Sequence, residues 1–161
     1  MSLIDDLYRQ NEWATLRLLE TCRTLTPEQL EASAEGTYGS IRRTLLHIVG
    51  GEPSYITRIG GRYEGPAIRY EPFPGFDALA EATRHAADGF IDRAQAALDQ
   101  SWTFTTPEGE TIDAEVVLVQ ALNHAAEHRA QICTILTTLG LEPPALDGWT
   151  WAVETGRVRM R

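Results

Sequence analysis

The sequence predicts an all-α fold in which four long amphipathic helices pack as a four-helix bundle. Four segments repeat apolar residues with the helical period of 3.6, and together they fill most of the 161 residues. Helix start and stop signals stand between the segments. The length suits a single domain with a sizeable core, so we expect one domain over residues 1–161.

The first segment covers residues 3–23, and its apolar stripe is interrupted by Asn11. On an inward face this amide either hydrogen-bonds a neighbouring helix or lines a pocket. A short helix is predicted next. Thr26 would be its N-cap, Pro27 its first residue, and Gln29 the return arm of a capping box.

The second long helix begins after Ser40, and His47 and Tyr55 lie on its apolar face. Gly51 stands one turn beyond His47 on the same side, where it would leave space. Pro53 lacks a backbone donor and should kink or loosen the helix. Helix-breaking residues so close to an inward histidine either make room for a ligand or produce a harmless kink.

The helical period is lost over residues 60–75, which are rich in Gly, Pro and Tyr. We expect a long crossover loop there, of the kind that commonly covers a site. The third long helix is predicted over residues 76–98, and its His85 lies well off the apolar stripe, facing solvent. Residues 102–112 alternate around a turn and form either a short hairpin or an extended arm.

The fourth long helix is predicted from about residue 113 to residue 139, with Gly140 ending it. The tail that follows contains Trp149 and Trp151. Large aromatic side chains normally pack against something, so we expect the tail to lie across the bundle or across a partner subunit.

Two histidines lie on the apolar stripe of the fourth helix. His124 and His128 are four residues apart, so both rings leave the same face of the helix. Burying an unpaired polar group costs roughly 1–3 kcal/mol, so two inward imidazoles need partners. Ordinary hydrogen bonds could supply them. A metal ion could also do so, with inward His47 completing a three-histidine site that leaves one position open for water or substrate.

Other metal motifs are absent. Thr44, Ala82, Ala121 and Ala125 stand three positions before the histidines, so the chain lacks the Glu-x-x-His motif of di-iron bundles. His-Glu-x-x-His is also absent, because Ala125 follows His124.

The composition indicates which kinds of partner and which cellular compartment to expect. The net charge of −9, from 14 basic and 23 acidic residues, argues against a nucleic-acid partner. No apolar run approaches the roughly 18 residues of a membrane helix, and the acidic N-terminus does not resemble a secretory signal. The two isolated cysteines, Cys22 and Cys133, are expected to be small buried apolar side chains. Such a low number of cysteines is typical of a protein in a reducing cytoplasm.

Three motifs resemble those of the DinB/YfiT-like superfamily, in that family's order and spacing. They are Asn11-Glu-Trp13, Thr44-Leu-Leu-His47-Ile-Val and Asn123-His124-Ala-Ala-Glu-His128-Arg-Ala-Gln131-Ile132. The resemblance implies a four-helix bundle, often dimeric, that holds one divalent metal ion through His47, His124 and His128. Glu127 and Ala130 depart from the family, which often has His and Gly there, but neither is one of the three ligands.

The resemblance implies a metal-dependent enzyme of the thiol S-transferase, isomerase or hydrolase type that acts on a small molecule. Three imidazoles suit Zn or Ni best, and Fe, Mn or Cu as well, with a low-molecular-weight thiol as co-substrate. We expect Glu52 to act as an acid/base group, Asn11, Gly51 and Tyr55 to line the pocket, and the chain to form a homodimer. One alternative is a non-catalytic, stress-responsive metal-binding bundle. Another is a bundle whose histidines bind no metal.

Overall fold

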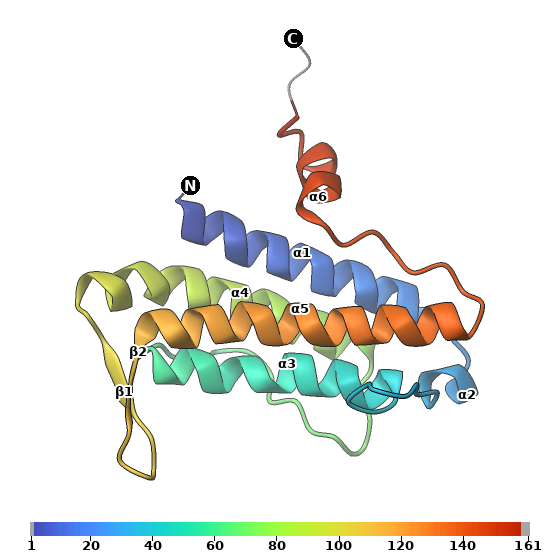
Figure 1. Ribbon diagram of the computed structural model, residues 1–161, viewed down its shortest axis with the longest axis horizontal. Helices are drawn as coiled ribbons and strands as arrows, with labels where there is room; N and C mark the ends of the chain where they lie inside the picture. Colours follow the sequence, from blue (N-terminus) through green and yellow to red (C-terminus); the bar gives the residue numbers. More distant parts are fainter. Residues whose placement is uncertain (1, 159–161) are drawn as a thin grey trace.

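The computed structural model describes residues 2–158, which form six helices and a two-stranded sheet (Figure 1). In chain order the elements are α1 (Leu3–Arg23), α2 (Pro27–Leu30), α3 (Ile41–Arg58), α4 (Phe76–Asp99), β1 (Thr103–Thr105), β2 (Thr111–Asp113), α5 (Ala114–Thr138) and α6 (Gly148–Glu154). The mostly helical class predicted from the sequence is confirmed, and a small sheet is added to it.

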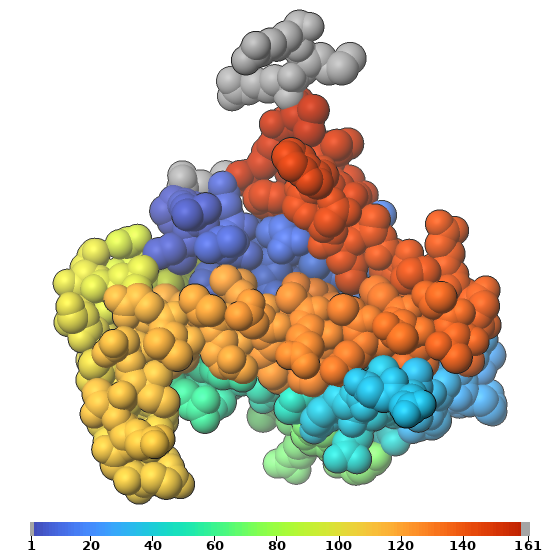
Figure 2. All heavy atoms as spheres, in the orientation of Figure 1, coloured from blue at the N-terminus to red at the C-terminus, as the bar shows by residue number. Residues whose placement is uncertain are grey.

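The four long helices, α1, α3, α4 and α5, lie side by side (Figure 1). The most extensive contacts join α1 to α4 and α3 to α5. Each of these two helices from the N-terminal half of the chain therefore packs against a helix from the C-terminal half. The hairpin and α6 project from opposite sides of this body, and α5 covers much of the face in Figure 2. Below α5 in that view, α3 is recessed between the hairpin and the segment that precedes α3.

The helix starts agree with the sequence signals. Thr26 accepts a hydrogen bond from the Gln29 backbone N–H, and the Gln29 side chain accepts one from the Thr26 N–H. The Ser40 hydroxyl accepts from the Arg43 N–H at the start of α3. Asp113 is the N-cap of α5 but makes no side-chain cap hydrogen bond.

The end of α3 requires a glycine. The helix continues through Pro53 to Arg58, and Gly60 then turns the chain with φ of 76°. A Cβ atom at Gly60 would lie 2.8 Å from Cζ2 of Trp102. The indole of Trp102 occupies that space and donates its Nε1–H to the Arg58 carbonyl at 3.0 Å, so the start of the hairpin is fixed to the end of α3.

The buried interior consists of two apolar clusters with a polar layer between them. One cluster contains Leu18, Leu45 and Ile132, and the other contains Tyr8, Ile56 and Ala121. The layer lies between them along the helices and consists of Asn11, Thr15, Glu52 and Arg129. Replacing buried ionic groups by well-packed apolar residues is often neutral or stabilising, so stability alone does not account for this polar layer.

Two of the connections between the long helices are a crossover loop and a hairpin. Residues 60–75 form the predicted crossover between α3 and α4, and its end is held by an edge-on contact between Phe73 and Phe76. β1 and β2 pair antiparallel with Phe104 opposite Ile112, so residues 102–112 form a hairpin rather than an arm.

The tail contacts α1 only in part. The indole of Trp13 donates to Glu154 at 3.2 Å, and Arg157 covers the ring of Trp151. Trp149, however, is 84% exposed, so this side chain does not pack within the described part of the chain, and packing of the tail against a partner subunit stays a prediction. None of the described helices combines the length and apolar character needed to cross a lipid bilayer.

Candidate metal centre

Three histidines from two helices meet at one point. His47 of α3 lies opposite His124 and His128 of α5, and one ring nitrogen from each lies within 4.8 Å of the other two. The three rings contact one another edge-on, with centroids 4.6–4.8 Å apart. The fourth histidine, His85, is exposed on α4 as predicted and takes no part.

This donor set fits a divalent ion. The Nε2 atoms of His47 and His124 are 2.9 Å apart, and the remaining separations reach up to 4.8 Å. Ring nitrogens around a tetrahedral zinc ion would lie about 3.3 Å apart, since each Zn–N bond is about 2.0–2.1 Å. Small ring rotations bridge that difference. Three neutral imidazoles suit borderline ions such as Zn, Ni, Cu or Fe.

Gln131 fixes the ring of His128. Its Oε1 lies 2.9 Å from His128 Nδ1 and also accepts the Tyr38 backbone N–H at 3.1 Å. An amide oxygen only accepts hydrogen bonds, so Nδ1 of His128 is the protonated nitrogen. In the neutral ring this leaves the lone pair on Nε2, which is the state a metal ligand requires.

Two tyrosines from loops hold His47. The ring of Tyr38, in the loop before α3, stacks on the imidazole with a centroid distance of 4.0 Å and an interplanar angle of 11°. The hydroxyl of Tyr70, in the crossover loop, lies 3.4 Å from His47 Nδ1. Both contacts leave Nε2 of His47 directed at His124. The crossover loop therefore covers one side of the cluster, as the sequence suggested.

Burial favours the neutral forms of His47 and His124. It lowers the pKa of His124 to about 4, with the charges of His128 and His47 adding to the effect. Burial also lowers the pKa of His47, followed by the charges of His128 and Arg43. At neutral pH these imidazoles are therefore unprotonated, and an ion need not displace a proton from them.

Glu52 belongs to the buried polar layer. Its Oε1 accepts a hydrogen bond from Asn11 at 3.4 Å, while Oε2 has no partner among the described residues. Arg129, next to His128 in the chain, donates to Asn11 at 2.6 Å and to Thr15 at 3.0 Å. Burial raises the pKa of Glu52 to about 8, against the opposing effects of Arg129 and Asn11.

The residues predicted to line the pocket fall into two places. Gly51 and Tyr55 lie against His124: a Cβ at Gly51 would be 3.4 Å from His124 Cε1, and the ring centroids of Tyr55 and His124 are 5.7 Å apart. Asn11 and Glu52 lie in the polar layer, and neither hydrogen-bonds a histidine in the described part of the chain. Their functional roles stay predictions.

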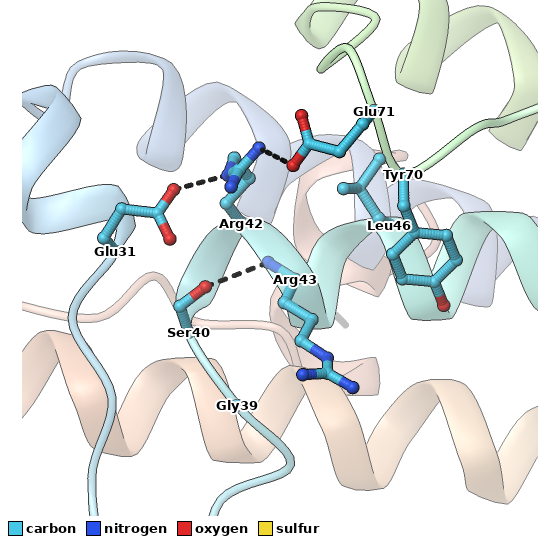
Figure 3. Close-up of a pocket in the computed structure, with 8 residues that line it drawn as sticks. All are labelled: Glu31, Gly39, Ser40, Arg42, Arg43, Leu46, Tyr70 and Glu71. Atoms are coloured by element: carbon cyan, nitrogen blue, oxygen red, sulfur yellow. Dashed lines mark hydrogen bonds and ion pairs between the residues drawn. The ribbon is translucent and has the colours of Figure 1, made fainter.

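A pocket of about 450 Å³ lies beside the cluster, between the start of α3 and the crossover loop (Figure 3). Its walls include Arg42 and Arg43 of α3, Tyr70 and Glu71 of the loop, and Glu31. Tyr70 is common to this pocket and to the contacts of His47.

Sequence reasoning missed Tyr38, Tyr70 and Gln131. The tyrosines lie in loops, where no periodicity predicts which side chains turn inward. Gln131 stands three residues after His128 on the same predicted helix, and that spacing is a signal that could have identified it.

The fold and the site together define a helical protein with a three-histidine cluster able to hold a metal ion. The chain belongs to the DinB family, whose sequence profile matches residues 1–156. This confirms the resemblance seen in the sequence motifs.

A solved structure supports the fold. A DinB-like protein from Bacillus cereus ATCC 10987 is similar over 86% of this chain and 91% of that chain, with a TM-score of 0.66 and 22% sequence identity. No curated protein matches this chain significantly.

Proposed function

We propose that this protein binds one divalent transition-metal ion, with zinc or nickel preferred, through His47, His124 and His128. We propose further that it is a metal-dependent enzyme of the thiol S-transferase, isomerase or hydrolase type. The observation that supports the site best is the convergence of three ring nitrogens within 4.8 Å on an α3–α5 interface. Family membership supports it independently.

The surrounding residues prepare the site for this role. Gln131 accepts from Nδ1 of His128, and the Tyr70 hydroxyl lies 3.4 Å from Nδ1 of His47; these two contacts orient both rings. Gly51 leaves space beside His124. A bound ion would supply Lewis acidity for a thiol or a water molecule at its open position.

Glu52 is our candidate acid/base group. Its pKa of about 8 lies close to the range in which general acids and bases work best. The side chain is buried against Asn11 of α1, so this role requires that a water molecule or the substrate reach the polar layer.

The test of the metal site is the metal content of the untagged protein purified without chelators. We expect about one equivalent of transition metal per chain in the wild type, and its loss in His124→Ala. His85→Ala is the matched control, because it removes an exposed histidine outside the cluster and should keep the ion. Equal metal content in all three proteins, or none in the wild type after incubation with zinc and nickel, would contradict the proposal.

The test of catalysis is transfer of a small thiol to an electrophile by the metal-loaded protein. We expect turnover that depends on the ion and is lost in His124→Ala. A broad panel of thiols and electrophiles without metal-dependent turnover would favour a non-catalytic metal-binding protein instead.

A second candidate, a helical bundle whose histidines bind no metal, is favoured by one contact. His47 and His124 are close enough to hydrogen-bond each other directly, with their Nε2 atoms 2.9 Å apart. A bundle whose histidines bind no metal would need that bond. It predicts that His124→Ala changes stability while neither protein contains metal.

Three further features belong to the proposal: one domain with a DinB-type four-helix bundle, a homodimer, and a cytoplasmic location. The dimer is supported by an apolar groove between α1 and α5, lined by Leu7, Leu118 and Val119, and the location by two free cysteines. Light scattering after gel filtration should give about twice the mass of the chain.

A further inference from the structure

The pocket beside the histidine cluster contains two arginines in different electrostatic states. Arg42 forms ion pairs with both Glu31 and Glu71, so its charge is compensated. Arg43, the next residue, has no acidic partner among residues 2–158, and its guanidinium lies over the ring of Tyr38 at 5.5 Å from the centroid. Arg43 therefore leaves a positive charge in the pocket with most of its donors free.

Arg43 and the Tyr70 hydroxyl face the same side of the pocket. Figure 3 shows both groups directed away from the Arg42–Glu71 pair. Gly39 makes room for the arginine, since a Cβ there would lie 3.1 Å from Arg43 Cδ.

The same two residues reach the histidine cluster. Arg43 covers Tyr38, which stacks on His47, and the Tyr70 hydroxyl lies 3.4 Å from His47 Nδ1. A small molecule held by Arg43 and Tyr70 would therefore lie next to the two side chains that contact His47. The volume of about 450 Å³ is within the usual range for a small-molecule site.

We propose that Arg43 and Tyr70 form a subsite for a carboxylate group of the substrate, so that the protein acts on small molecules bearing a carboxylate. This inference rests on the proposed function, because it assigns a substrate class to that site. The planar guanidinium can bind a carboxylate in bidentate fashion, through two parallel N–H···O hydrogen bonds, and the Tyr70 hydroxyl supplies a further donor.

The pocket favours a singly charged anion over a phosphate. Glu31 and Glu71 form part of its lining, and Arg42 pairs with both. These two acidic side chains would repel a doubly charged phosphate more strongly than a singly charged carboxylate ligand. A single unpaired arginine matches a single negative charge.

Propionate is a suitable probe, with propionamide as its neutral analogue and inorganic phosphate as the competing anion. The full-length, ¹⁵N-labelled protein would be titrated with each while the Arg43 Nε–H signal and the Ser40–Arg43 amide signals are followed. We expect propionate to shift these signals and propionamide to have little effect. Arg43→Gln should weaken propionate binding about tenfold. The matched control is Arg84→Gln, which removes an exposed positive charge on α4.

Repeating the titration after metal removal by a chelator separates this inference from the proposed function. Propionate binding that persists without metal and is weakened by Arg43→Gln supports the subsite even if the protein proves to need no ion. Propionate binding that depends on the metal and is unchanged in Arg43→Gln would place the carboxylate on the ion and overturn the subsite. Equal binding of propionamide, or tighter binding of phosphate through Arg43, would overturn the assignment to carboxylates.

Discussion

Gln131 is the residue on which the state of His128 depends. Its amide oxygen accepts hydrogen bonds from a backbone N–H and from a ring N–H, 3.1 and 2.9 Å away. Reversing the amide would bring its own N–H groups against two donors, so only one orientation satisfies both. A residue that touches no ion thereby determines which nitrogen of His128 is available to bind one.

Replacing Gln131 with Met should weaken metal binding without unfolding the protein. The variant keeps the length of the side chain but removes the acceptor for His128 Nδ1. We expect a loss of 10–100-fold in metal affinity, the usual effect of removing such a partner, measured by competition with a chelating dye. Gln95→Met is the control, because Gln95 bonds only to exposed Asp99 on α4. Unchanged affinity in Gln131→Met would show that Gln131 does not orient the ring.

Glu52 should make the stability of the protein fall as pH rises. The folded protein keeps a proton on Glu52 up to about pH 8, whereas the unfolded chain releases it near pH 4.5. Between these values the folded state binds more protons, so the free energy of unfolding decreases with pH, by at most about 1.4 kcal/mol per pH unit.

Glu52→Gln isolates this effect, since both proteins keep the same histidines. Chemical denaturation of the metal-free proteins at pH 5, 6.5 and 8 should show wild-type stability declining relative to the variant. A constant difference between the two proteins would mean that Glu52 is charged throughout this range.

Among the elements, the helices and the crossover loop were predictable, whereas the side chains that the loops turn inward were not. Capping at Thr26 and Ser40 and periodicity in the long segments locate α1 to α5 within a residue or two, because both signals are local in sequence. The exposed position of Trp149 was not predictable, because hydrophobicity alone does not say which aromatic side chain finds a neighbour.

Two glycines, one inside α3 and one just beyond its end, should respond oppositely to alanine. Gly50 lies inside the helix, and a Cβ there would meet Ile68 at an ordinary 3.7 Å. Gly50→Ala should therefore raise the free energy of unfolding by about 0.5–1 kcal/mol. Gly60→Ala should lower it by more than that, because φ is 76° and the new Cβ would overlap Trp102. Denaturant titration of both variants checks the pair, and a destabilised Gly50→Ala would contradict the first expectation.

Across the whole molecule, the sequence identified the three histidines but not the residues that prepare them. His47, His124 and His128 were predictable because each lies on the inward face of a helix. Tyr38 and Tyr70 reach His47 from two separate loops, and that arrangement depends on tertiary structure rather than on any local pattern. The pocket formed by those loops was unpredictable for the same reason.

A metal ion that binds the folded protein alone should stabilise the whole chain. At a free concentration 100 times Kd, the stabilisation is about 2.7 kcal/mol, roughly 5–10 °C in Tm for a chain of this length. We expect this shift with zinc or nickel, its reversal by a chelator, and its absence in His124→Ala. An equal shift in that variant would mean that the ion binds elsewhere.

The hydrogen bond from the Tyr38 backbone to Gln131 couples an exposed loop to the interior of the site. That amide and the ring of His128 share one acceptor, so the position of the imidazole is linked to that of the loop. We expect an ion bound to His128 to slow solvent exchange of the Tyr38 backbone N–H, so that this proton would report occupancy of the proposed site. It can be read by magnetic resonance or mass spectrometry before any substrate has been found.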